Sequence, residues 1–399
     1  MEMKQGQAIF QTVPRIVFGV GSIEGLGAEL KRTGGRRVAV ITDSGIVGAG
    51  IDRLAVDALV KEGLEAAVFE GVEPDPRIDI AGRAAEFVRD QGADAIVGLG
   101  GGSSMDIAKA AAVICTNPDP IEAYKGVNQV PRPGLPTVLV PTTAGTGSEV
   151  TSIAVLSDTA NKVKVGVVSD HMFARCALLD PALTVKLPPR VTASTGLDAL
   201  IHAIESYVGR QASFMTEPLA LAAIELVAEN LRKAYACGED LDARTGMLRA
   251  SLLAGMAFAN TQTGAAHACA LALGGAFHVP HGIATSLMLP AVMRFNSIAV
   301  PEKFARIAAI FGEKVAGLPP TAAARRAVAA VIDLIEDVDF ELGLENYGVT
   351  ESDIPGLAEA SILPAARLWN NNPRSATREQ VERIFLDSMS AGVAALKGE

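Results

Sequence analysis

A change of pattern near residue 188 is the feature that most constrains the fold of this chain. Before it, short β-branched and apolar runs alternate with amphipathic segments. After Leu187-Pro188-Pro189, long segments rich in alanine, leucine and glutamate follow one another. Repeats of strand, helix and strand indicate a parallel sheet covered by helices. We therefore expect an α/β domain over residues 1–188 and an all-helical domain over residues 189–399.

Hydrophobic periodicity places the individual elements. In the first half, strands are expected at 37–42, 93–98 and 136–140, with a further candidate at 163–168. Helices are expected between the first two strands, at 51–62 and 78–91. In the second half, helices are expected at 195–208, 217–236, 243–257, 302–311, 321–334 and 378–396.

The composition agrees with a folded chain of two domains. Its 399 residues are 49% hydrophobic and 20% charged, which is too apolar for a disordered protein. The net charge of −10 argues against binding to nucleic acid or to an anionic membrane. The four cysteines form no CxxC pair, so a disulfide scaffold and a zinc ribbon are not expected. A reducing compartment, the cytoplasm, suits this cysteine usage better.

A long uncharged stretch raises the question of a membrane span. Residues 250–293 contain no aspartate, glutamate, lysine or arginine. A membrane-crossing helix needs about 20 mostly apolar residues in a row, but polar side chains, prolines and glycines interrupt every such window here. We expect buried helices around a polar pocket. The N-terminal segment also lacks the apolar core of a signal peptide.

A glycine-rich loop follows the second predicted strand and opens a helical pattern at residues 98–109. Consecutive glycines let the backbone approach a ligand, and Ser103 or Ser104 can cap the helix, whose free N–H groups favour an anion such as pyrophosphate. A plain tight turn before a capped helix would have the same pattern. Asp43 ends an earlier strand, where a carboxylate can accept hydrogen bonds from a ribose. Asp43 can equally be a turn residue or a helix N-cap.

A second polar loop, residues 141–149, follows the third predicted strand. It contains four hydroxyl side chains and two glycines, which can bind a dinucleotide through hydroxyl and backbone donors. A solvated loop is the alternative, although solvated loops seldom carry so little charge. We therefore interpret it as a second binding loop.

The second half contains candidate metal ligands. Asp198 and His202 are four residues apart in a strong helical pattern, so their side chains share one helix face. His267 and His281 lie fourteen residues apart in the uncharged stretch. Three imidazoles and one carboxylate suit Zn²⁺ or Fe²⁺. The alternative is a capping aspartate with hydrogen-bonded core histidines, and spacing alone does not exclude it.

Five segments together resemble the iron-containing (group III) alcohol dehydrogenase family, and the resemblance runs over nearly the whole chain. They are GGGSSMDIAK at 100–109, PTTAGTGSE at 141–149, GLDALIHAIE at 196–205, GAAHA at 264–268 and PHG at 280–282. The resemblance implies an α/β dinucleotide-binding domain with a parallel sheet, followed by an all-α metal-binding domain, the fold shared with dehydroquinate synthase.

The resemblance also implies an activity and its site. It implies an NAD(H)-linked alcohol dehydrogenase or aldehyde reductase that uses Fe²⁺, with Zn²⁺ as the alternative, to hold the substrate oxygen. It also implies a homodimer or larger homo-oligomer. The family's metal ligands correspond to Asp198, His202, His267 and His281, which would also act in catalysis through the metal. Its cofactor positions correspond to Asp43, Asp75, Gly101, Gly102, Ser103, Ser104, Asp106, Thr142, Thr143, Thr151 and Lys164.

The chain departs from the family pattern at one position. Many members carry a further histidine four residues after the third metal ligand, where this chain has Leu271. His278 could partly substitute for it as a catalytic residue, or water and ribose hydroxyls could suffice. Phe258 and Leu271 are expected to line the substrate side, and His171 is given no role.

Other functions stay open at this point. One is a maleylacetate reductase-type oxo-acid reductase, although such relatives typically lack the full metal set. Another is a lyase resembling dehydroquinate synthase, although the sequences of the 141–149 and 196–205 segments point away from it. The third is a non-catalytic protein that binds a nucleotide or a metal.

Overall fold

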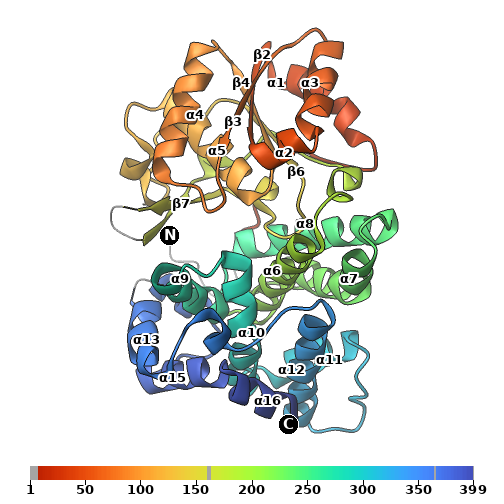
Figure 1. Ribbon diagram of the computed structural model, residues 1–399, viewed down its shortest axis with the longest axis vertical. Coiled ribbons are helices and arrows are strands. Elements are labelled where there is room, and N and C mark those ends of the chain that lie inside the picture. Colours follow the sequence, from red (N-terminus) through yellow and green to blue (C-terminus); the bar gives the residue numbers. More distant parts are fainter. Residues whose placement is uncertain (1–7, 160–162, 364, 399) are drawn as a thin grey trace. The chain divides into compact units, whose positions relative to one another are not determined.

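The structure, a computed structural model, describes residues 8–159, 163–363 and 365–398. These residues form two compact units (Figure 1). One contains residues 11–187 and is an α/β unit; the other contains the residues from 188 onward, together with residues 8–10. Within the described residues, no helix combines the length and the apolar character that a membrane crossing requires.

A six-stranded sheet with only parallel neighbours forms the centre of the α/β unit. The inner strands are buried along most of their length because helices cover both faces, which agrees with the continuous apolar runs in the sequence. The strand order is β1 (Ile16–Phe18), β9 (Cys176–Leu179), β6 (Thr137–Pro141), β4 (Ala95–Gly100), β2 (Arg37–Asp43) and β3 (Glu65–Val72).

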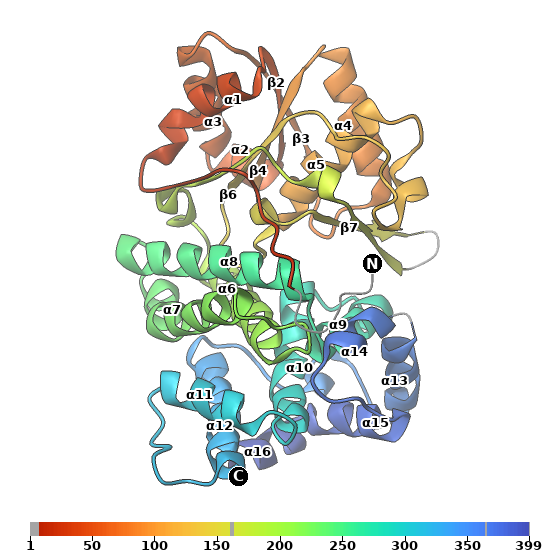
Figure 2. The same ribbon diagram turned by 180° about the vertical axis from the view of Figure 1, so that it is seen from behind.

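Helices lie on the two faces of this sheet (Figures 1 and 2). On one face, α1 (Leu26–Thr33) and α3 (Ile51–Lys61) pack Leu30 and Leu59 against Val40 and Val97 of the sheet. On the other lie α4 (Ile78–Asp90) and α5 (Gly102–Thr116). A short helix, α2 (Ser44–Gly48), directly follows β2. The parallel order brings the ends of β2, β4 and β6 to one edge of the sheet, where Asp43 and the two polar loops lie.

The strand predictions were right for three inner strands within about two residues, but incomplete elsewhere. The candidate at 163–168 is a strand, β8 (Val163–Val168), yet it lies outside the parallel sheet. It pairs antiparallel with β7 (Ile153–Asp158) and parallel with β5 (Gly126–Val127) in a separate three-stranded sheet. The edge strand β3 was missed because glutamates and a glycine interrupt its apolar run, as an exposed edge permits.

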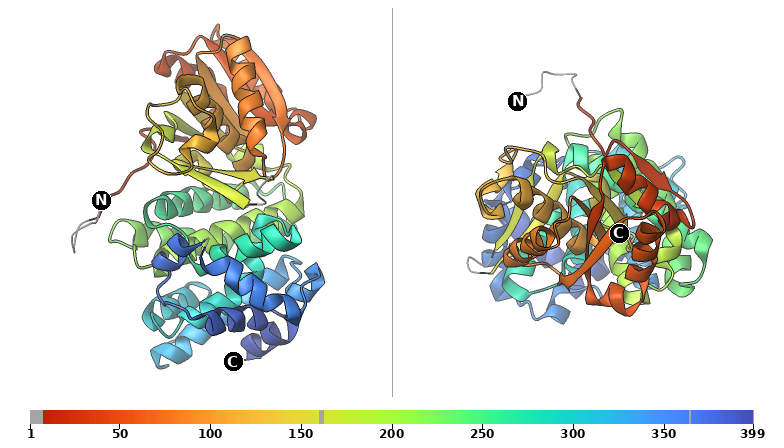
Figure 3. Two further views of the ribbon diagram at one scale, coloured as in Figure 1. Left: turned by 90° about the vertical axis from the view of Figure 1, so that its left-hand side faces the viewer. Right: turned by 90° about the horizontal axis from the view of Figure 1, so that it is seen from above.

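The second unit contains helices and no strand among its described residues (Figures 2 and 3). Its early helices are buried on most sides, which agrees with their long alanine and leucine runs. The helices are α6 (Pro189–Val208), α7 (Thr216–Ala236), α8 (Leu241–Thr261), α9 (Ala265–Phe277), α10 (His281–Asn296), α11 (Pro301–Ile310), α12 (Pro320–Asp337), α13 (Ile354–Ile362), α14 (Ala366–Asn371), α15 (Arg378–Asp387) and α16 (Ser390–Gly398).

The single helix expected at 378–396 is wrong, because the structure breaks it into α15 and α16. The Ser388 hydroxyl donates to the carbonyl of Ile384, and both oxygens of Glu345 accept the backbone N–H of Ser390. A carboxylate that comes from a distant segment therefore caps the second helix. Periodicity along the segment itself contains no sign of this cap.

Candidate metal centre and nucleotide loops

Helix α6 carries two of the four expected metal ligands on one face. It begins at a proline, which suits the first helical turn, and its second half is buried all round. Asp198 and His202 lie one turn apart, and Nδ1 of His202 is 3.8 Å from Oδ2 of Asp198. Both side chains are buried. The spacing of four residues therefore produces the local half of the site, as the helical pattern predicts.

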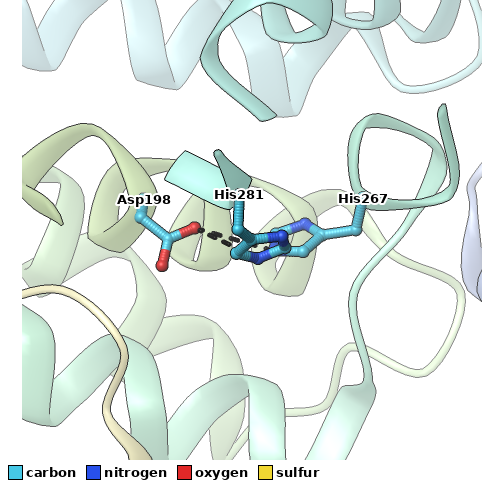
Figure 4. Close-up of side chains that lie close together, drawn as sticks. All are labelled: Asp198, His267 and His281. Atoms are coloured by element: carbon cyan, nitrogen blue, oxygen red, sulfur yellow. Dashed lines mark ion pairs between the residues drawn. The ribbon is translucent and has the colours of Figure 1, made fainter. Parts of the chain in front are cut away.

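His267 and His281 come from the first turns of α9 and α10. Figure 4 shows both imidazoles facing the carboxylate of Asp198. The Nε2 atoms of His267 and His281 lie 3.9 and 3.8 Å from Oδ1 of Asp198. One ligand atom from each of these three residues lies within 4.8 Å of the others. Segments far apart in the sequence thus converge on one small volume.

The donor atoms of this cluster suit a metal cation. Oδ1 of Asp198 and Nε2 of His267 are buried and have no hydrogen-bond partner. A buried carboxylate oxygen without a partner is costly, and a cation bound by both atoms would offset that cost. Burial raises the pKa of Asp198, against the opposing effect of His281 and His267. Among the described residues, Asp198, His267 and His281 form the one group of three such side chains that could hold a metal ion.

His202 lies beside the cluster rather than within its three-residue core. Its ring stacks on that of His267, with centroids 4.7 Å apart, and on that of Phe258, with centroids 4.2 Å apart. The half-buried Phe258, expected on the substrate side, therefore contacts an expected metal ligand directly. The aromatic stacking limits how far the His202 ring can turn.

The glycine-rich loop leads from β4 into α5, as expected. The residue that caps α5 is Gly101, without a side-chain hydrogen bond, so the prediction that Ser103 or Ser104 caps the helix is wrong. Both serines lie inside the first turn. Gly100 has a φ of 143°, and a Cβ there would lie 2.7 Å from Oγ of Ser104. Only glycine suits this backbone, and no side chain occupies the N-terminal N–H groups of α5.

Asp43 is a helix cap, one of the alternatives left open by the sequence. Its Oδ1 accepts from the backbone N–H groups of Gly45 and Ile46 at the start of α2. Its Oδ2 accepts from the hydroxyl of Ser104, which ties the end of β2 to the first turn of α5. The carboxylate is half-buried, and its role in the fold does not exclude a second role toward a ligand.

The second polar loop is packed tightly rather than solvated. Thr142 and Thr143 have buried hydroxyl oxygens without a hydrogen-bond partner. A Cβ at Gly102 would lie 2.9 Å from Cγ2 of Thr146, so the two loops approach each other closely. Buried unpartnered hydroxyls beside a helix N-terminus are groups that a polar ligand can satisfy.

A buried lysine holds this loop against α5. Lys109 is 1% exposed and donates to the carbonyl and hydroxyl of Ser148 and to the carbonyl of Ile153. Asp106 accepts from the Ser148 hydroxyl at 2.6 Å and from the backbone N–H of Val155. Thr151 joins the network through Ser148 and Lys109. The expected cofactor positions Asp106 and Thr151 therefore hold the loop in place.

The two remaining expected cofactor positions, Asp75 and Lys164, form an ion pair with each other. Asp75 has a φ of 50°, and its carbonyl accepts from the Ser157 hydroxyl. The pair links the segment before α4 to the small sheet. The side chain of Asp75 is about half exposed and that of Lys164 about one-quarter exposed, so both stay accessible to a ligand.

Comparison with known proteins identifies the family. The profile of the Fe-containing alcohol dehydrogenase family, C-terminal, matches residues 192–389, and that of iron-containing alcohol dehydrogenase matches residues 14–181. The chain belongs to the iron-containing alcohol dehydrogenase family. A sulfoacetaldehyde reductase from Bilophila wadsworthia is 44% identical over 94% of this chain and 97% of its own length.

Solved structures of the iron-containing alcohol dehydrogenase family agree in fold. A 1,3-propanediol oxidoreductase is 38% identical, with a TM-score of 0.93 over 96% of this chain and all of its own. A sulfoacetaldehyde reductase from Bifidobacterium kashiwanohense in complex with NAD⁺ is 31% identical, with a TM-score of 0.86 over 96% of this chain and 99% of its own. The expected fold, a parallel α/β domain followed by a helical domain, is confirmed.

Leu271, where many iron-containing alcohol dehydrogenases have histidine, lies one turn after His267 on α9. It is half-buried and packs with Ala268, Leu368 and Trp369 in a small apolar cluster. His278 is exposed and caps the end of α9 with a φ of 55°. It is not a member of the three-residue metal cluster. His171 is exposed as well, in the other unit.

Sequence reasoning missed three buried polar residues that support the site. Glu205 hydrogen-bonds to His267, and Asn371 and Asn372 hold the loop that leads into α9. Asn371 donates to the carbonyls of Gln262 and Thr263, and Asn372 accepts from the N–H of Ala265. The only available signal for Glu205 was its place in the 196–205 segment, three residues after His202.

Proposed function

We propose that this protein is a metal-dependent, NAD(H)-linked alcohol dehydrogenase that can also work as an aldehyde reductase. The observation that carries the proposal is the buried Asp198 carboxylate facing two imidazoles, with unpartnered atoms directed into the same volume. A metal ion bound there would act as a Lewis acid toward the substrate oxygen. Its ligands would be Asp198, His202, His267 and His281. The residues around it position the ligands and limit the access of water.

Fe²⁺ is the metal we propose, with Zn²⁺ as the alternative. Three imidazoles and one carboxylate are a donor set that both ions accept. The family descriptions name iron and support the first choice. Because Zn²⁺ binds such a set tightly, the metal found in purified protein need not be the one used in the cell.

NAD is the cofactor we propose for the α/β unit, where it would supply the hydride acceptor. A relative of the same fold has been solved with NAD⁺, which supports this choice. The bare N-terminus of α5 suits a pyrophosphate, and the unpartnered hydroxyls of Thr142 and Thr143 suit a polar ligand at the neighbouring loop. Of the other expected positions, Asp106 and Thr151 support the loop, and Asp75 and Lys164 stay accessible as an ion pair.

Short alcohols and aldehydes are the substrate class we propose, since the relatives above are named for sulfoacetaldehyde and 1,3-propanediol. Phe258 stacks on His202 and makes part of the surroundings of the metal cluster apolar, and Leu271, one turn after His267, would extend that apolar side. The test is anaerobic reconstitution with Fe²⁺ or Zn²⁺ and a panel of alcohols, diols, aldehydes, sulfonated aldehydes and oxo acids, followed through NADH. Tight stoichiometric metal binding with no turnover on the whole panel would overturn the proposal.

The assembly and the compartment belong to the same proposal. We propose a homodimer or larger homo-oligomer in the cytoplasm, with a small alcohol or aldehyde as substrate and no nucleic acid or membrane as partner. The four cysteines are free thiols, which supports a reducing compartment. Light scattering on the purified holoprotein measures the assembly, and a monomer would contradict this part of the proposal.

Replacing Asp43 by serine is expected to weaken the preference for NADH over NADPH by about tenfold or more. The carboxylate repels a 2′-phosphate, and its removal takes away that repulsion. Serine keeps the cap of α2, because its hydroxyl can also accept from the backbone N–H groups. The ratio of kcat/KM for the two cofactors measures the effect, and an unchanged ratio would remove Asp43 from the cofactor site.

Replacing His278 by glycine tests whether this histidine substitutes for the one missing at Leu271. Because His278 is exposed and outside the metal cluster, we expect an unchanged pH–rate profile, the result if the proton leaves without help from this side chain. Glycine suits the positive φ of this position, so the fold is not strained. A lost or shifted limb in the pH profile of kcat would instead make His278 the proton relay.

A further inference from the structure

Glu205 lies on the same face of α6 as two of the proposed metal ligands. It follows Asp198 by seven residues and His202 by three, and residues at these spacings form one stripe along a helix. Its side chain is 4% exposed. A buried carboxylate needs strong partners, so the groups around it define its role.

Three hydrogen-bond donors converge on this carboxylate. Oε2 of Glu205 accepts from the backbone N–H of Gly264 at 2.7 Å and pairs with Nδ1 of His267 at 2.6 Å. Oε1 accepts from the backbone N–H of Ala266 at 2.7 Å. Glu205 therefore holds both the imidazole of His267 and the backbone that leads into α9. A Cβ at Gly264 would lie 3.1 Å from Oε1, a tight contact that requires the carboxylate to shift by a few tenths of an ångström.

The pairing decides which ring nitrogen of His267 is free. A carboxylate has no proton to donate, so Nδ1 is the donor and carries the hydrogen. In the neutral imidazole, which is the form that binds a metal, Nε2 is then the nitrogen with the free lone pair. This Nε2 is the buried, unpartnered atom 3.9 Å from Oδ1 of Asp198. A hydrogen-bonded carboxylate behind a metal-bound imidazole sets the tautomer and makes the imidazole a stronger ligand.

We propose that Glu205 is a positioning residue that orients His267 as a metal ligand through its Nε2 atom. This inference rests on the metal site of the proposed function. A glutamine at this position can accept only at Oε1, so its NH₂ group would face at least one of the three donors. With its NH₂ group toward Nδ1 of His267, the glutamine would turn the imidazole or favour its other tautomer, and both move the lone pair away from the metal site. With its NH₂ group toward Ala266, it would lose that backbone hydrogen bond and hold Nδ1 with a neutral, weaker acceptor.

Metal affinity of the E205Q protein is the first measurement. We expect Zn²⁺ and Co²⁺ to bind about 10- to 100-fold more weakly than to the wild type, in competition with a chromophoric chelator. The visible absorption of the Co²⁺ form should also change, because the ligand geometry changes. Glu225→Gln is the matched control, since Glu225 is exposed on α7 and its replacement removes the same charge. This control should bind both metals with wild-type affinity.

Nuclear magnetic resonance of histidine-labelled protein is the second measurement and needs no variant. In the Zn²⁺-loaded wild type, we expect one zinc-bound histidine with a strongly downfield Nδ1 proton, which the E205Q protein loses. If E205Q does not fold, E205D takes its place, because it keeps the charge but shortens the reach to the three donors. The same loss of affinity is then expected.

The outcomes separate this inference from the function on which it rests. Wild-type affinity and an unchanged Co²⁺ spectrum in a folded E205Q protein would overturn the role of Glu205 and leave the metal site standing. A zinc-loaded wild type without any Nδ1 proton on a zinc-bound histidine would do the same. A wild-type protein that binds neither metal would overturn the proposed function and this inference with it.

Discussion

Replacing Asp198 or His267 by alanine is expected to abolish tight metal binding and to lower kcat/KM by about a thousandfold or more. Loss of a Lewis acid removes several kcal/mol of transition-state stabilisation, which corresponds to a rate factor of this size. Asp198 is the anionic member of the cluster, and both His267 and His281 face its Oδ1 atom. His267 contributes the unpartnered Nε2 atom.

The measurement is metal content after anaerobic reconstitution and dialysis, together with NADH-linked turnover. His171→Ala is the control, since it removes an exposed imidazole from the other unit and should change neither quantity. Thermal unfolding of the metal-free proteins shows whether the fold is retained. Full metal content and full turnover in both alanine variants would contradict the proposed metal centre and the function built on it.

Replacing Glu149 by glutamine is expected to stabilise the protein at alkaline pH. Glu149 is 1% exposed in the turn Ser148–Val150, and its Oε1 has no hydrogen-bond partner. Burial raises the pKa of this carboxyl to about 7, although its own backbone N–H and Lys109 act in the opposite direction. The folded protein therefore binds the proton more tightly than the unfolded chain does.

The sign of the pH dependence follows from this raised pKa. Stability due to the protonated carboxyl is fully present below the unfolded value of about 4.5 and is lost as the pH rises through about 7. The loss between about pH 5 and about pH 8 amounts to roughly 2–3 kcal/mol. Glutamine stays neutral throughout this range, so the E149Q protein should not show this part of the loss.

Urea unfolding of the full chain at the two pH values measures the effect, with wild type and variant compared at each. Other groups titrate equally in both proteins, so the difference between them isolates Glu149. Glu122→Gln, at an exposed position of the same unit, is the control and should follow the wild type. The same fall in stability with pH in the wild-type and E149Q proteins would contradict the prediction.

Much of the fold was predictable because the signals for it are local. The inner strands β2, β4 and β6 have continuous apolar runs, since helices cover both of their faces. The edge strand β3 and the break between α15 and α16 were not predictable. An edge strand tolerates glutamates, and the break depends on Glu345, a carboxylate that lies 45 residues before the amide it caps.

Of the candidate site, the sequence by itself determined the local pairs. Asp198 and His202 share a helix face because four residues make about one turn, and a strand followed by a glycine run leads into the N-terminus of a helix. His267 and His281 were further candidates in the uncharged stretch, and the family resemblance joined them to that pair. Without it, a separation of 65 residues from His202 to His267 would have carried little weight.

Only the tertiary structure decided how the distant parts meet. It brings His267 and His281 to the carboxylate of Asp198 and places Glu205 behind His267. It also shows that the serines expected to cap α5 lie inside its first turn, and that the hydroxyl of Ser104 donates to Asp43. Helical and strand periods are properties of neighbouring residues. The convergence of three helices on one buried carboxylate depends on how α6, α9 and α10 pack. Patterns of neighbouring residues do not predict this packing.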